Sequence, residues 1–221
     1  MRHFDVEIND LKNRLMEMAG LVQQMIKTTI DQLVLRESKL SESIFALEKE
    51  VNIQEIVIDD KCLKLIALNQ PVGVDLRFIT SAMRINSDLE RLGDEAVNIS
   101  EMSLELINYA ELKPLIDIPK MAEIVQQMLA SSIKAFNNND VELANSVLEK
   151  DDEVDDLKDR VFKDLKEYMT KSSDPETIER AVDLLMVARS IERIGDHATN
   201  ISEDVIFMVH GKDIRHPKIC R

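Results

Sequence analysis

The segment Leu89–Glu101, LERLGDEAVNISE, returns at Ile191–Glu203 as IERIGDHATNISE. A second segment behaves in the same way: Met18–Met25, MAGLVQQM, returns at Met121–Met128 as MAEIVQQM. The two offsets are 102 and 103 residues. Separated segments that recur almost in register indicate a duplicated unit of about a hundred residues. The sequence therefore predicts two copies of one fold.

Within each copy, apolar residues recur at the spacing of an amphipathic helix, as in Leu89, Leu92, Ala96 and Ile99. Polar segments and prolines divide each copy into three helices. Short connections make neighbouring helices antiparallel. We predict an all-α fold of two tandem, pseudo-symmetric three-helix bundles with six long helices. The predicted domains are 1–112, 113–210 and a C-terminal tail at 211–221, and the predicted helices lie near 5–36, 41–68, 75–110, 117–136, 140–170 and 175–209.

Composition and charge exclude several classes of function. A chain of 221 residues can bury a core without disulfides. Its formal net charge of -14 repels phosphate backbones, so we expect no direct binding to nucleic acid. Cys62 and Cys220 are far apart and form no Cys-x-x-Cys motif, which favours a reducing compartment. No apolar segment is long enough to span a bilayer, and no secretory signal is visible. We expect a cytoplasmic protein.

Side chains with oxygen donors follow one side of the third helix of each copy. At about 100° per residue, positions i, i+4, i+8 and i+11 fall within a stripe roughly 80° wide. The apolar residues of the same helix point about 175° away, so we expect the stripe on the outer face. The preceding helix adds an aligned pair in each copy. In the first copy these residues are Glu90, Asp94, Asn98, Glu101, Glu48 and Asn52, and in the second they are Glu192, Asp196, Asn200, Glu203, Asp151 and Asp155.

Acidic residues on an outer helix face usually do no more than keep the helix solvated. Their recurrence in both copies favours a second interpretation, because two neighbouring acidic helices repel and a hard cation would relieve that repulsion. We therefore expect a metal site on the outer face of each copy, provided that the two helices bring their stripes together. His197 replaces Glu95 beside the second stripe and is expected to be an exposed helical histidine rather than a nitrogen ligand. The mid-helix Gly93 and Gly195 would allow close approach of a backbone or ligand, or simply close packing.

Motifs of catalysis are missing from the sequence. It contains no P-loop, no Gly-x-Gly-x-x-Gly and no Gly-x-Ser-x-Gly, the common signatures of nucleotide-binding proteins and hydrolases. The Glu-x-x-His motif of di-iron helical bundles is also missing. We expect a protein that is not an enzyme.

The repeated LERLGD and IERIGD segments, together with Leu65–Arg77 (LIALNQPVGVDLR), resemble the PhoU family of phosphate-signalling proteins over nearly the whole chain. The resemblance implies a regulatory adaptor that restrains phosphate uptake and the phosphate-starvation response. Its implied partners are a sensor histidine kinase and the ATPase subunit of the phosphate ABC transporter, both at the inner face of the membrane. It also implies a homodimer.

The resemblance further implies multinuclear metal clusters, of iron or zinc, on the E/D-x-x-x-D motifs, with magnesium, manganese or calcium as open alternatives. Asn52 departs from the acidic pattern, which leaves the first site weaker in charge and its number of metal ions open. Glu55 and Asp59 of the first copy correspond to Lys158 and Phe162, so the two sites should not be equivalent. The other functions considered are a metal or phosphate buffer and a metallohydrolase. The metal motifs are Glu48–Asn52, Glu90–Asp94, Asp151–Asp155 and Glu192–Asp196, with Asn98, Glu101, Asn200 and Glu203 as further ligands because they share the stripes.

Overall fold

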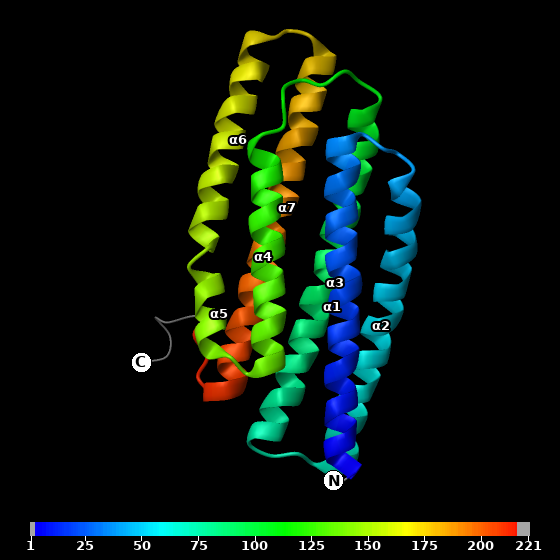
Figure 1. Cartoon of the computed structure of the whole chain (residues 1–221), viewed down its shortest axis with the longest axis vertical. Coiled ribbons are helices and arrows are strands. Elements are labelled where there is room, and N and C mark those ends of the chain that lie inside the picture. Colours follow the sequence, from blue (N-terminus) through cyan, green and yellow to red (C-terminus); the bar gives the residue numbers. More distant parts are fainter. Residues whose placement is uncertain (1–2, 216–221) are drawn as a thin grey trace.

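The computed structural model describes residues 3–215, and these form α-helices without any strand (Figure 1). The all-α fold of two tandem helical bundles is confirmed. The first bundle comprises α1 to α3, and the second comprises α4 to α7. The helices are α1 (His3–Leu35), α2 (Leu40–Asn69), α3 (Val74–Ile107), α4 (Asp117–Asn138), α5 (Val141–Leu148), α6 (Asp151–Lys171) and α7 (Pro175–His210).

One predicted helix is wrong, because the expected element at 140–170 is two helices, α5 and α6, with a break at 149–150. The backbone N–H of Lys150 donates to the carbonyl oxygen of Val147 at 3.1 Å, and that of Glu153 donates to the carbonyl oxygen of Lys150 at 3.1 Å. Both bonds span three residues rather than four, so the chain tightens there into turns that end one helix and begin the next. The described chain therefore has seven helices.

Local sequence explains several helix ends. The side chains of Asp140 and Asp174 accept hydrogen bonds from the backbone N–H groups of Leu143 and Thr177, at 2.9 and 3.1 Å. These contacts satisfy donors that the first turn of a helix leaves unpaired. At the other end of α7, Gly211 has a φ of +69°, the left-handed conformation with which many helices stop. These residues fix the start of α5 and both ends of α7.

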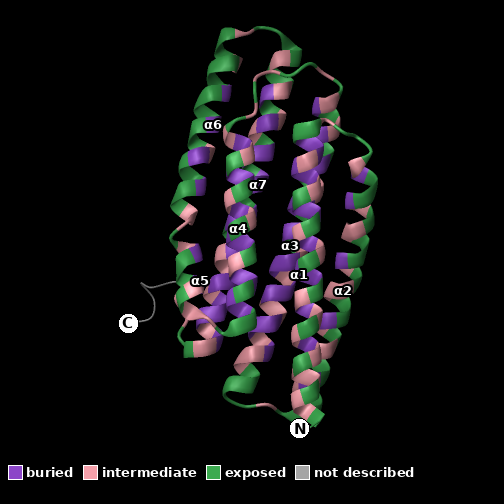
Figure 2. Cartoon of the chain, in the orientation of Figure 1, coloured by how far each residue is buried: buried purple, intermediate pink, exposed green. Residues whose placement is uncertain are grey.

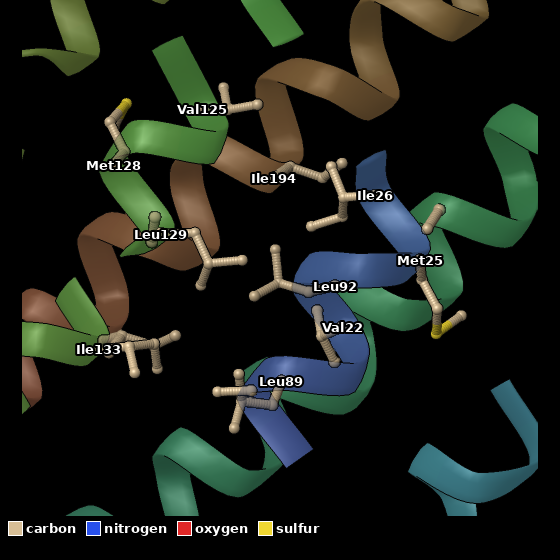
Figure 3. Close-up of a cluster of buried hydrophobic side chains, with 14 of the residues drawn as sticks. Val22, Met25, Ile26, Leu89, Leu92, Val125, Met128, Leu129, Ile133 and Ile194 are labelled. Carbon is tan, nitrogen blue, oxygen red and sulfur yellow. The ribbon is translucent and has the colours of Figure 1, made fainter. Parts of the chain in front are cut away.

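The two bundles pack against each other mainly through α3 and α7, which run antiparallel in the middle of the molecule (Figure 1). Side chains from both copies meet there in one continuous core (Figure 3). In that view Leu92 of α3 and Ile26 of α1 lie near Ile194 of α7 and Leu129 of α4. Burial follows the inner sides of the central helices, while α2 and α6 are open along their outer sides (Figure 2).

Between residues 3 and 215, no helix combines the length and the apolar character that a bilayer crossing requires.

Candidate metal centre

The acidic motifs of neighbouring helices come together in both copies. In the first copy, the carboxylate of Asp94 on α3 lies close enough to Glu48 on α2 for the two charges to interact, and Glu90 interacts with Glu55 in the same way. In the second copy, Asp196 on α7 interacts with Asp151 and Asp155 on α6. We refer below to the first-copy cluster (Glu48, Asn52, Glu55, Glu90 and Asp94) and the second-copy cluster (Asp151, Asp155, Lys158, Glu192 and Asp196).

The first-copy cluster has an excess of negative charge. Partial removal from water raises the pKa of Asp94, and the negative charges of Glu48 and Glu95 raise it further. The pKa of Glu90 is raised in the same order, by partial burial and then by Asp94 and Glu55. In both cases the effects that disfavour the charged form outweigh those that favour it. A cation placed between α2 and α3 would reverse that balance.

Asn52 is tied to the same cluster by a hydrogen bond. Its Nδ2 donates to Oε1 of Glu48 at 2.8 Å, four residues away on α2. A rotation of the amide by a half turn would present Oδ1 to the cluster instead, and a carbonyl oxygen of this kind is an ordinary ligand for a hard cation. Asn52 can therefore serve as a neutral ligand.

The second-copy cluster differs because it contains a cation of its own. The Nζ of Lys158 lies 2.6 Å from Oδ1 of Asp155 and 3.2 Å from Oε1 of Glu192, so it bridges α6 and α7. Hydrogen bonds to these two carboxylates raise the pKa of Lys158. The equivalent position in the first copy is Glu55, so the duplicated clusters have opposite charge at one place.

Lys158 does not neutralise the whole second-copy cluster. Partial burial raises the pKa of Asp151 to about 6, and the charges of Asp196 and Asp155 contribute to the shift. The pKa of Asp196 is also raised, by partial burial and then by Glu192. Within this cluster, the carboxylates whose pKa values stay raised despite Lys158 are therefore Asp151 and Asp196.

Apart from Lys158, both clusters offer oxygen ligands, which suit magnesium, calcium, manganese and iron. Among residues 3–215, however, no three acidic, histidine or cysteine side chains are grouped so that they could hold a metal ion as they stand. The donor chemistry and the charge of the first-copy cluster fit a cation, whereas in the second copy Lys158 already occupies the position between two carboxylates.

The remaining predicted ligands lie towards the interface between the copies. The Nδ2 of Asn98 donates to Glu95 and the Nδ2 of Asn200 donates to Asp88, each at 3.4 Å. Glu101 lines a hollow of about 400 Å³ with Arg189 and Arg193 of α7, and Glu203 lies close enough to Arg215 for their charges to interact. The structure therefore places Asn98, Asn200 and Glu101 beside α3–α7 contacts, and the role of all four residues as ligands stays a prediction.

The α3–α7 interface contains buried polar side chains that sequence reasoning missed. Nδ1 of His197 lies 2.8 Å from Oδ1 of Asp88, and both side chains are buried. The prediction that His197 is exposed was therefore wrong. Arg193 and Arg84 form ion pairs across the interface with the buried Glu95 and Asp204, at 2.7 and 3.0 Å. The spacing of these polar residues in the sequence could have indicated the interface. Polar residues recur every seven positions, and all of them are buried: Ser81, Asp88 and Glu95 on α3, and Ser190, His197 and Asp204 on α7.

Comparison with known proteins agrees with the duplicated fold. The PhoU domain model matches the chain twice, at residues 15–103 and 118–205. A PhoU homologue from Aquifex aeolicus, named a phosphate-specific transport system accessory protein, is 38% identical over 213 residues, with 96% of each chain covered. A protein of the same name from Pseudomonas aeruginosa is 34% identical over 221 residues, covering 100% of this chain and 90% of the relative.

Solved structures show the same relationship in three dimensions. The crystal structure of PhoU from Pseudomonas aeruginosa superposes with a TM-score of 0.91 at 33% identity, covering 95% of this chain and 100% of that one. The phosphate transport system regulatory protein PhoU from Streptococcus pneumoniae gives a TM-score of 0.87 at 25% identity, covering 96% and 99%. Sequence and structure thus match across both copies, and the chain belongs to the PhoU family.

Proposed function

We propose that this protein is a regulatory adaptor of phosphate homeostasis that restrains phosphate uptake and the phosphate-starvation response. The observation that carries the proposal is the match of both copies, over the full chain, to accessory and regulatory proteins of phosphate transport. Its proposed partners are the ATPase subunit of the phosphate ABC transporter and a sensor histidine kinase. It would meet them at the cytoplasmic face of the membrane, as a homodimer and without catalysing a reaction.

A second element of the proposal is that the first-copy cluster binds a divalent cation. The raised pKa values of Glu90 and Asp94 support it, because partial burial, and then the neighbouring carboxylates, disfavour the negative charges that a bound cation would favour. Glu48, Glu90 and Asp94 would supply carboxylate ligands, and Asn52 would supply a carbonyl oxygen. A bound cation would tie α2 to α3 and stabilise the outer side of the first bundle. The oxygen ligands accommodate iron, manganese, magnesium or calcium, and zinc less readily.

In the second copy, a cation has to displace Lys158 from Asp155 and Glu192. This displacement costs the two ion pairs that the lysine makes, so we expect weaker binding than in the first copy. The end of the cluster that holds Asp151 and Asp196 keeps an excess of negative charge. The two clusters should therefore fill in sequence, the first-copy cluster before the second.

The regulatory role is tested by deleting the gene and measuring phosphate uptake and phosphatase expression in high phosphate. We expect both to rise, and wild-type protein supplied in trans should restore them. A Glu90→Gln, Asp94→Asn variant supplied in the same way shows whether the cation contributes to regulation. Unchanged uptake and phosphatase expression in the deletion strain would contradict the adaptor function, whatever metal the protein binds.

A further inference from the structure

The outer side of α2 carries large apolar side chains in contact with water. Ile53, Ile56 and Leu63 are 60%, 67% and 57% exposed. The core side of the same helix is also apolar, since Ile44, Val51 and Ile58 are buried against the bundle (Figure 2). A helix that is apolar on two sides is normally covered on both, and exposed apolar patches of this kind mark sites of protein association.

The second copy shows that this property does not come from the fold. At the equivalent positions, 103 residues later, α6 has Asp156, Asp159 and Lys166, all of which are exposed. The core sides of the two helices nevertheless correspond, because Val154 is buried at the position of Val51. At these three positions the first copy therefore carries apolar residues, and its duplicate carries charged ones.

The exposed residues on the outer side of α2 have the spacing of a coiled-coil seam. Alternating steps of three and four residues keep them on one side of the helix. The residues of this seam, all exposed, are Ala46, Lys49, Ile53, Ile56, Asp60 and Leu63. Two such seams complement each other when the helices run antiparallel. If the two-fold axis passes between Gln54 and Glu55, a small residue faces a large one, a cation faces an anion, and isoleucine faces isoleucine. The facing pairs, each made twice, are Ala46 with Leu63, Lys49 with Asp60, and Ile53 with Ile56.

We propose that a second copy of this chain packs antiparallel on this seam of α2. The proposal rests on the homodimer of the proposed function and names its surface. A net charge of -14 opposes pairing over most of the molecule, but the two charged residues of the seam have opposite signs and face each other. Asp60 also forms an exposed ion pair with Lys64 of its own helix, at 2.5 Å, which Lys49 of the second copy would share. An interface of this kind is isologous, since each copy uses the same surface.

Pairing through this seam leaves the first-copy cluster accessible. Glu48 and Glu55 point roughly 130° or more around α2 from the middle of the seam, at 100° per residue. They face α3, where Asp94 and Glu90 lie. The dimer and the proposed cation therefore use different sides of the same helix.

The experiment measures the mass of the full-length protein by sedimentation equilibrium at micromolar concentration. We expect a dimer for the wild type and a monomer for Ile53→Asp, Ile56→Asp. A matched control is Val182→Asp, which places the same charge on an exposed apolar position of α7 and should leave the dimer intact. Circular dichroism checks that each variant retains its helices.

A charge exchange makes the test specific for the facing pairs. Lys49→Asp places two anions opposite each other and Asp60→Lys places two cations, so each should weaken the dimer about tenfold or more. The double variant Lys49→Asp, Asp60→Lys restores opposite charges and should restore the wild-type dissociation constant. This recovery is not expected if α2 packs against a membrane or another protein.

The possible failures are distinguishable. A wild-type dimer that survives Ile53→Asp, Ile56→Asp overturns this seam and leaves the homodimer standing on another surface. A monomeric wild type overturns both, while the regulatory role and the cation site keep their own tests.

Discussion

The Nζ of Lys158 lies 3.2 Å from Oε1 of Glu192, so the second copy holds its own cation between α6 and α7. The first copy has Glu55 at the equivalent position and brings only oxygen ligands to its cluster. Two clusters derived from one duplicated unit therefore carry side chains of opposite charge at this position, and this difference should decide where a metal ion binds first.

Replacing Lys158 with glutamate should open the second-copy cluster. Lys158→Glu removes the internal cation and supplies a further carboxylate, so we expect affinity for Mn²⁺ at this cluster to rise about tenfold or more. Titration calorimetry in a Glu90→Gln, Asp94→Asn background isolates the second copy. Lys163→Glu is the matched control, because Lys163 is an exposed cation of the same helix. An equal gain with the control would show that net charge alone is responsible.

Removing His197 should destabilise the interface between the copies. In a His197→Ala variant the buried Asp88 keeps, among residues 3–215, only the hydrogen bond from Asn200 at 3.4 Å. We expect the free energy of unfolding to fall by about 2 kcal/mol, the typical penalty for a buried polar group that loses its partner. Urea denaturation measures the change. His210→Ala, at the exposed end of α7, should cost less than about 0.5 kcal/mol. Similar losses of unfolding free energy in the two variants would show that the His197–Asp88 pair does not stabilise the interface.

Cys62 should react only when the protein unfolds. Burial raises the pKa of its thiol to about 12, so at pH 8 the folded protein holds about a thousandfold less thiolate than a free cysteine would. A Cys220→Ser variant treated with a thiol reagent should therefore label slowly in buffer and rapidly in urea. Rapid labelling of the folded variant would contradict the burial of this side chain.

The same thiol makes stability depend on pH. Because its pKa is higher in the folded state than in the unfolded state, the folded state binds more protons above about pH 9, and stability should fall as pH rises from there towards 12. Cys62→Ala should flatten that part of the stability curve. An unchanged slope would show that other groups cause the loss at high pH.

Alanine should fit at Gly93. A Cβ atom there would lie 3.5 Å from Cγ1 of Val51 and 3.7 Å from Cε of Met25, which are ordinary contacts. Gly93→Ala should therefore stabilise the metal-free protein by about 0.5–1 kcal/mol through helix propensity, as should Gly20→Ala, where nothing lies within 4 Å. Thermal unfolding of both variants tests this. A loss of stability confined to Gly93→Ala would show that α2 and α3 require the glycine.

Much of the fold could be predicted because it depends on local patterns and on the duplication. The positions of Pro175, Asp174 and Gly211 indicate where α7 begins and ends, and the structure agrees. The break at 149–150 could not be predicted, because Glu149 and Lys150 are good helix formers and neither glycine nor proline marks the change. The tail at 211–221 lies largely outside the described residues.

The candidate site was only half visible in the sequence. The spacing predicts that Glu90 and Asp94 lie on one side of α3. Whether Glu48 comes near Asp94 depends on how α2 packs against α3, and the spacing within one helix does not determine that packing. His197 and Asp88 were missed for a different reason. A helix in a single bundle has one buried side, whereas α3 and α7 each bury a second side against the other copy. Polar residues seven positions apart follow that second side.

The central claim is that the first-copy cluster binds a divalent cation. Anomalous diffraction from crystals grown with Mn²⁺ tests it most directly. We predict an anomalous peak among Glu48, Glu90 and Asp94, with ligand distances of about 2.1–2.3 Å, and a weaker peak or none beside Lys158. Crystals that show water alone along α2 and α3, with manganese in excess, would contradict the claim.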